Sequence, residues 1–302
     1  MTPELREKWL LERRKGIGGS DAGVICGLSP WKSPYQLYLE KRGEASGPEE
    51  TEPMRWGTML EPVIRQRYAD VTGRTVQLVP EILQHPKHAW MLGSLDGIAE
   101  DRVLEVKTAR LPTGWGDPEE TPVVIPDVYH AQVQHYMAVT GLVLCDVAVL
   151  IGGSDFRIYE VPADAEVQGL IIDQEAEFWQ RVQAGEPPEP TTFADVKARF
   201  GAASRSASVT ATKNIMEEIG LLKRVKESMG ALKATEEQAK AEIMKFLAEK
   251  DTLVALDGTV LVTWKKSKDS TKFDADAFKR EHPGLYAQYS KPTAGSRRFL
   301  TK

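Results

Sequence analysis

Three residues with charged side chains, Asp96, Glu105 and Lys107, occur at a spacing that suits metal-dependent cleavage of a phosphodiester bond. A four-residue turn separates two apolar runs here, which predicts an antiparallel hairpin in which Ile98 faces Val103. Side chains two residues further along each strand keep the same face, so Asp96 stands opposite Glu105 and Lys107 follows on that face. Two neighbouring carboxylates repel each other unless a cation lies between them, and Mg²⁺ or Mn²⁺ prefers such oxygen ligands. The hairpin therefore predicts a metal site, although the same three residue types also occur together by chance on solvated strands.

A helix before this hairpin carries a further acidic candidate, Glu61. Apolar residues recur every four positions and Gly73 follows them, which predicts a helix buried along one stripe. The residues of this stripe are Trp56, Leu60, Ile64 and Tyr68. Glu61 borders the stripe, where it is a candidate metal ligand or water-orienting group. The alternative is a Glu in the first turn that only favours the helix dipole.

A second helix is predicted after the hairpin, around residues 129–139. It places Tyr129, Gln132 and Tyr136 along one side. A side-chain amide on a largely apolar helix usually has a specific partner. Gln132 is therefore a candidate for the same site.

The glycine-rich segment 13–20 has the composition of a phosphate-binding loop. Its glycines permit a tight chain path, and Arg13, Arg14, Lys15 and Ser20 are candidate phosphate ligands. The alternative for Ser20 is an N-cap on a helix that starts near Asp21. The two arginines compete as the basic partner, because the spacing to Ser20 fits one and the spacing to Gly16 fits the other.

Five sequence blocks, taken in order, resemble the phage-type alkaline exonucleases, the lambda exonuclease and YqaJ recombinase group of the PD-(D/E)XK nuclease superfamily. These blocks are residues 14–22, 55–61, 93–97, 104–107 and 131–134, and the resemblance covers about residues 9–185. It implies an α/β fold with a restriction-endonuclease-like core, in which helices flank a central mixed sheet. Leu95 stands where the family usually has Pro, but the neighbouring Gly97 retains the common turn chemistry.

The resemblance also assigns roles to residues. It implies that Asp96, Glu105 and the Val106 carbonyl ligate Mg²⁺, with Mn²⁺ as a possible substitute, and that Lys107 positions the attacking water. Glu61 and Gln132 would complete the active site. Ser20, with either Arg13 or Arg14, would bind a terminal 5′-phosphate.

The activity that the resemblance implies is 5′ to 3′ degradation of double-stranded DNA ends, which releases 5′-phosphorylated nucleotides and exposes a 3′ single strand. The expected partners are DNA, a single-strand annealing protein and further copies of the chain in a ring trimer. Two alternatives stay open. One is a structure-selective endonuclease or nickase on the same fold, and the other is a DNA-binding recombination partner whose site does not hydrolyse.

Composition separates the chain into an acidic and a basic part. The 302 residues carry a net charge of −5, but the last 99 residues are net basic and the first 203 net acidic. With the Pro- and Ser-rich stretches near residues 187–208, this predicts a nuclease core over 1–203 and a helical plus small β accessory region over 204–302. The chain has only two cysteines, which favours a reducing compartment. It has no apolar run of membrane-spanning length, so the cytoplasm of a host cell is the expected location.

Overall fold

The computed structural model describes residues 11–45, 47, 50–202, 208–292, 295 and 297–301. By its internal contacts the chain divides into two units, Met1–Arg199 and Phe200–Lys302. The boundary predicted between residues 203 and 204 lies outside the described residues.

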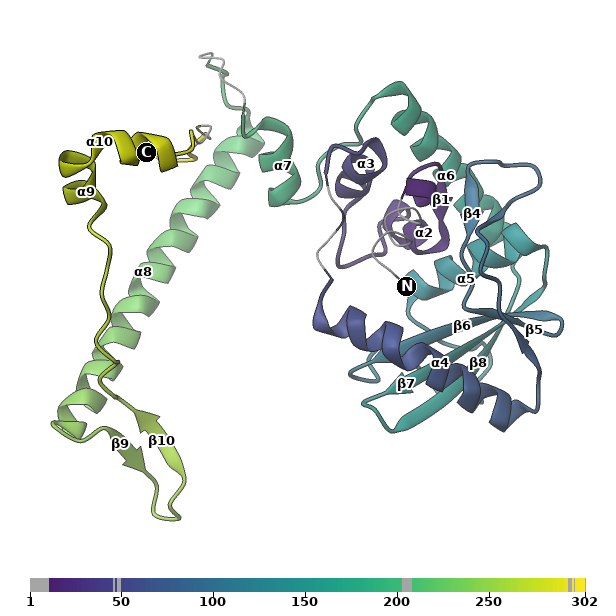
Figure 1. Cartoon of the computed structure of the whole chain (residues 1–302), viewed down its shortest axis with the longest axis horizontal. Coiled ribbons are helices and arrows are strands. Elements are labelled where there is room, and N and C mark those ends of the chain that lie inside the picture. Colours follow the sequence, from purple (N-terminus) through teal and green to yellow (C-terminus); the bar gives the residue numbers. More distant parts are fainter. Residues whose placement is uncertain are drawn as a thin grey trace. The chain divides into compact units, whose positions relative to one another are not determined.

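A five-stranded mixed sheet forms the centre of the first unit (Figure 1). Its strands, in spatial order, are β2 (Val76–Gln77), β5 (Gly97–Ala99), β6 (Arg102–Ala109), β7 (Leu144–Ile151) and β8 (Asp155–Pro162). Only the β6–β7 pair is parallel, and the other three pairs are antiparallel. The α/β class with a central mixed sheet flanked by helices is therefore confirmed.

The predicted hairpin is present, with a shorter turn than expected. Ile98 faces Val103 as predicted, but Ala99 also pairs with Arg102, so only two residues lie in the turn. Glu100 takes a φ of 58° there. A two-residue reversal with positive φ matches the twist of antiparallel strands, which explains why the strands extend closer to the turn than the sequence suggested.

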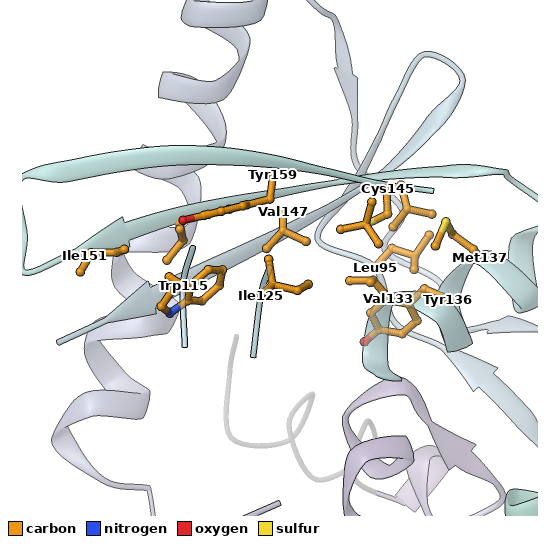
Figure 2. Packing of buried hydrophobic residues seen from close by; sticks show 13 residues of the cluster. Leu95, Trp115, Ile125, Val133, Tyr136, Met137, Cys145, Val147, Ile151 and Tyr159 are labelled. Carbon is orange, nitrogen blue, oxygen red and sulfur yellow. The ribbon is translucent and has the colours of Figure 1, made fainter. Parts of the chain in front are cut away.

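Helices cover both faces of the sheet. Helix α4 (Glu52–Thr72) packs its Ile64 and Tyr68 side chains on the face formed in part by Leu104 and Val106. Helix α5 (Asp127–Thr140) lies in the crossover between β6 and β7 and covers the opposite face. Figure 2 shows side chains of this second interface, including Val133 and Tyr136 from α5.

The apolar stripe predicted on α4 is only partly buried. Ile64 and Tyr68 are buried and Leu60 is partly buried, but Trp56 is 54% exposed. The buried part of the stripe thus begins at Leu60, and the first turns of the helix do not rest on the sheet core. Gly73 ends the helix with a φ of 69°, as the sequence predicted.

Buried polar residues tie α4 to the sheet. The Tyr68 hydroxyl donates a 2.6 Å hydrogen bond to Asp146 on β7, and Arg102 on β6 forms an ion pair with the same carboxylate at 3.1 Å. A buried carboxylate without such partners would destabilise the fold. The network therefore fixes α4 against β6 and β7.

The first unit also contains a smaller sheet and several further helices. A small sheet has the order β1 (Ile17–Gly18), β4 (Met91–Gly93) and β3 (Leu83–Gln84). The helices are α2 (Gly19–Ile25), α3 (Pro34–Arg42), α6 (Ala165–Ala184) and α7 (Phe193–Phe200). Asp195 of α7 accepts a 2.8 Å hydrogen bond from Ser33, the N-cap of α3.

The second unit is dominated by one helix, α8 (Lys213–Leu247), which Thr212 caps. A hairpin of β9 (Thr252–Val254) and β10 (Val260–Thr263) follows, then α9 (Ala275–Glu281) and α10 (Pro283–Tyr289). The described residues of this unit thus contain three helices and one small hairpin. Among the described residues of this unit, Leu247 is the only buried apolar side chain.

Candidate active site

The hairpin of β5 and β6 brings the three charged residues together. Glu105 and Lys107 lie on the face of β6 that α5 covers, and their side chains form an ion pair. Asp96 immediately precedes β5, and its Oδ2 accepts a 2.8 Å hydrogen bond from the Val106 backbone N–H. The backbone of Val106 thus holds one acid in place, while Lys107 contacts the other.

Gln132 completes this cluster from helix α5. Its Nε2 donates a 2.7 Å hydrogen bond to Glu105, and its Oε1 accepts a 3.2 Å bond from Lys107. The Gln132 side chain is buried. The amide that the sequence placed on an apolar helix therefore bridges Glu105 and Lys107.

Burial and mutual repulsion make the two acids difficult to ionise. Burial, and after it the repulsion from the Asp96 carboxylate, raises the pKa of Glu105 to about 8. Burial likewise raises the pKa of Asp96. Burial by itself lowers the pKa of Lys107, but attraction to Glu105 and Asp96 raises it overall, so Lys107 is a cation. Two acids with raised pKa values beside one lysine form a site in which additional positive charge is stabilising.

One carboxylate oxygen of the cluster is available to contact such a positive charge. Among the described residues, Glu105 Oε2 is one of the few buried side-chain oxygens without a hydrogen-bond partner. An unpaired buried carboxylate oxygen is unfavourable unless another group contacts it. Carboxylate and carbonyl oxygens are the donors that Mg²⁺ and Mn²⁺ prefer, so the residues fit a hard divalent cation.

Glu61 is not preassembled with these acids as a ligand. Its carboxylate forms an ion pair with Arg65 one turn along α4. Burial raises the pKa of Glu61, and repulsion from the Asp96 carboxylate raises it further. Glu61 therefore interacts electrostatically with the site. In the described part of the chain, His, Cys, Asp and Glu side chains form no metal-holding group of three or more. The role of Glu61 stays a prediction.

The two arginines of the amino-terminal segment differ in their contacts. Arg13 Nη2 donates a 2.6 Å hydrogen bond to Ser20 Oγ, while Arg14 is exposed. Ser20 lies within α2, whose N-cap is Gly18, so the N-cap alternative for Ser20 is wrong. Arg13 and exposed Ser20 thus form a polar pair, and which of the two arginines binds a phosphate stays a prediction.

Asp21 and Lys41 hold this segment in place through buried polar contacts. Lys41 Nζ lies 2.6 Å from Asp21 Oδ2 and donates a 2.9 Å hydrogen bond to the Arg13 carbonyl. Burial alone would raise the pKa of Asp21, but Lys41 and Arg13 hold it well below its usual range. Sequence reasoning missed Lys41, because no local pattern connects a residue of α3 with position 13.

Tyr136 connects the two polar groups. Its hydroxyl accepts a 3.3 Å hydrogen bond from Gln132, and the charge of Arg13 acts on the same hydroxyl. A β-carbon at position 19 would overlap the Tyr136 ring, so only glycine lets α2 approach α5 this closely. The candidate phosphate pair therefore lies on the same side of α5 as the acids.

Tyr129 and Trp31 form an aromatic extension of the site. Lys107 Nζ lies 4.8 Å from the centroid of the Tyr129 ring. Trp31 stacks on Tyr129 with centroids 6.4 Å apart, and Trp115 contacts Tyr129 at 5.7 Å. The sequence placed Tyr129 on the side of α5 that carries Gln132, but it gave no signal for Trp31.

A family model and a curated relative point to the same family. Residues 8–143 match the YqaJ-like viral recombinase domain. The chain is 32% identical over 300 residues to the uncharacterized protein YqaJ of Bacillus subtilis (strain 168), which covers 95% of this chain and 92% of that protein.

Two solved structures are also similar. An alkaline exonuclease (LHK-Exo) from Laribacter hongkongensis is 23% identical with a TM-score of 0.48, over 60% of this chain and 94% of that chain. A phage-related exonuclease from Haemophilus somnus 129PT is 11% identical with a TM-score of 0.43, over 56% and 96%. Within the described residues, every helix is too short or too polar to cross a membrane.

Proposed function

This chain belongs to the YqaJ-like viral recombinase family, and from that membership and its site we propose that it is a Mg²⁺-dependent 5′ to 3′ exonuclease that acts on double-stranded DNA ends. The observation that carries the proposal is the buried Glu105 carboxylate. One of its oxygens accepts from Gln132 and contacts Lys107, and the other has no hydrogen-bond partner among the described residues. Because Asp96 and Lys107 lie beside it, this carboxylate is suited to share a divalent cation with Asp96.

Asp96, Glu105 and the Val106 carbonyl are the groups that would hold the cation. When bound, Mg²⁺ would polarise the scissile phosphate and lower the pKa of a coordinated water. Mn²⁺ suits the same oxygen donors. The carbonyl role of Val106 comes from the family resemblance, whereas its N–H already orients Asp96.

The protein side chains contribute positioning and charge. Gln132 fixes the Glu105 carboxylate by a hydrogen bond, which restricts its rotation. The Lys107 ammonium lies beside the acids, where it can orient the attacking water and offset the negative charge that develops on the phosphate. Glu61 and its partner Arg65 border the same charges and would complete the site.

End recognition is assigned to Arg13 and Ser20. A guanidinium and a hydroxyl joined at 2.6 Å present adjacent donors, which suit a terminal 5′-phosphate. Recognition of a chain end would make the enzyme exonucleolytic and would fix the direction of degradation. The annealing partner and the ring trimer stay predictions of the family resemblance.

Digestion of two DNA substrates tests the proposal. A linear duplex with 5′-phosphates is compared with a covalently closed circle, each with Mg²⁺ or with chelator, using wild type and Lys107→Ala. We expect Mg²⁺-dependent loss of the linear duplex alone, with 5′-phosphorylated nucleotides as products, and none of it with Lys107→Ala. Cleavage of the circle would instead identify an endonuclease or nickase. DNA binding without metal-dependent cleavage of either substrate would identify a non-catalytic recombination partner.

A further inference from the structure

An exposed tryptophan stands beside the catalytic lysine. Trp31 is 70% exposed, although burial of an indole is among the most favourable of side-chain burials. Its ring stacks on Tyr129 at an interplanar angle of 28°, and the Tyr129 ring in turn carries Lys107 Nζ at 4.8 Å. The exposed ring is thus one aromatic contact away from the group that would position the attacking water.

The loop around Trp31 is anchored on both sides. The Trp31 backbone N–H donates a 3.3 Å hydrogen bond to Ser29 Oγ, and Lys32 forms a 2.6 Å ion pair with Glu40 of α3. Ser33 caps α3 and bonds to buried Asp195. The exposure of Trp31 is therefore imposed by a well-connected segment, and its ring is presented at a defined place.

The platform under Trp31 is equally fixed. Tyr129 contacts Trp115, which is buried, and Trp115 contacts the buried Tyr159 of β8 at 5.3 Å. The Tyr159 hydroxyl donates a 2.8 Å hydrogen bond to the Gly116 carbonyl. A row of aromatic rings thus runs from the core of the sheet to a free aromatic surface next to the site.

We propose that Trp31 is a stacking subsite for a nucleobase of the DNA strand whose phosphate reaches Lys107. The proposal rests on the proposed function, because the phosphate group at the site would bring its attached nucleotide within reach. Every nucleobase has a flat π-surface, so stacking on an indole supports binding without sequence preference. Sequence-independent contact suits an enzyme that degrades DNA from its ends.

The chemistry of the neighbourhood favours a base over other occupants. Lys107 supplies positive charge for the phosphate, and the aromatic surface lies next to it. A nucleotide carries both a charged and a flat aromatic group in one molecule. Alternation of aromatic and basic side chains is the usual composition of a single-strand binding surface.

A cycle of two changes tests the subsite. Wild type, Trp31→Ala and Trp31→Phe are assayed on a 5′-phosphorylated duplex, intact or with one abasic nucleotide at the first, second or third position of the degraded strand. We expect Trp31→Ala to lower kcat/KM about tenfold on intact DNA, mostly through KM, and Trp31→Phe to retain most of the activity. At the contacted position, removal of the base should cost wild type the same factor and cost Trp31→Ala nothing further. Equal losses for Trp31→Ala on intact and abasic DNA at all three positions would overturn the proposal.

Binding without turnover separates this inference from the proposed function. In chelator, the affinity of a short 5′-phosphorylated single strand is measured by fluorescence anisotropy, again with and without the abasic nucleotide. Trp31→Ala should bind the intact strand more weakly than wild type does, and this difference should disappear on the abasic strand. That result would support the subsite even in a chain that does not cleave DNA. Unchanged binding would refute it. Phe193→Ala, which removes another exposed ring of the first unit (79% exposed), is the control and should leave both assays unaltered.

Discussion

Gln132 on helix α5 donates a 2.7 Å hydrogen bond to Glu105 on strand β6. The two residues are 27 positions apart in sequence, and the bond joins the helix of the crossover to the strand that carries the charged groups. Because Gln132 also accepts a hydrogen bond from Lys107, one amide orients both members of the ion pair.

Gln132→Ala should therefore reduce activity more than stability. Without the amide, Glu105 and Lys107 are free to adopt other rotamers, and we expect kcat to fall about 10- to 100-fold with little change in KM. Steady-state kinetics on a linear duplex measures this. Gln134 is the matched control, a buried glutamine of the same helix that bonds to the Pro162 carbonyl and the Asp164 N–H. Gln134→Ala should lower the melting temperature but keep kcat, and a similar kcat loss in both variants would contradict the assignment.

Removal of the charge at position 105 should uncouple the protein from divalent cations. Glu105→Gln keeps the shape of the side chain but weakens a ligand, so Mg²⁺ should raise the melting temperature of wild type and not of the variant. In chelator at neutral pH, Glu105→Gln should be at least as stable as wild type, because the raised pKa of Glu105 means that the folded chain disfavours its ionised form, whereas the pKa of Asp21 is lowered by folding. Differential scanning calorimetry with and without MgCl₂ measures both effects. Glu177→Gln, on the exposed surface of α6, serves as the control. A Mg²⁺ response that survives Glu105→Gln would place the cation elsewhere.

The two arginines should differ in their effect on end recognition. Arg13 bonds to Ser20, whereas Arg14 is exposed. We expect Arg13→Ala to remove most of the preference for 5′-phosphate over 5′-hydroxyl ends, a loss of about tenfold or more. Arg14→Ala should preserve the preference. Initial rates on the two kinds of duplex end measure it, and the reverse outcome would assign the phosphate to Arg14.

Asp21→Asn should destabilise the fold near neutral pH. The variant leaves the Lys41 ammonium buried without its 2.6 Å partner, and we expect the free energy of unfolding to fall by about 3 kcal/mol. The pKa of Asp21 is lowered in the folded chain, so its stabilisation is present above the unfolded pKa, near 4, and is lost as the pH falls towards the folded value. Urea unfolding between pH 3 and pH 7 should show the difference between wild type and variant shrinking below about pH 4. A difference that grows in acid would refute this account.

Local pattern was sufficient to predict the parts of the site that one hairpin holds. The register of Ile98 with Val103 follows from alternation along two adjacent strands, and it places Asp96 and Glu105 side by side. The side of α5 that carries Gln132 follows from helical periodicity in the same way.

Features that depend on tertiary packing could not be read from the sequence. Trp56 continues the apolar period of α4 but is exposed, because periodicity does not show where the sheet ends beneath a helix. Lys41 selects the position of Arg13 through a bond to a residue 28 positions earlier, which no local spacing encodes. The aromatic contact between Trp31 and Tyr129 likewise joins segments about a hundred residues apart in the chain.

The parallel pairing of β6 with β7 gives the site an order of assembly. The hairpin of β5 and β6 is local and can form early, and by itself it holds both acids but not the amide. Gln132 reaches Glu105 only when the crossover closes and β7 aligns beside β6. Long-range pairing of parallel strands is slow compared with formation of a local hairpin. Recovery of catalysis during refolding should therefore follow the long-range step and lag behind the appearance of secondary structure.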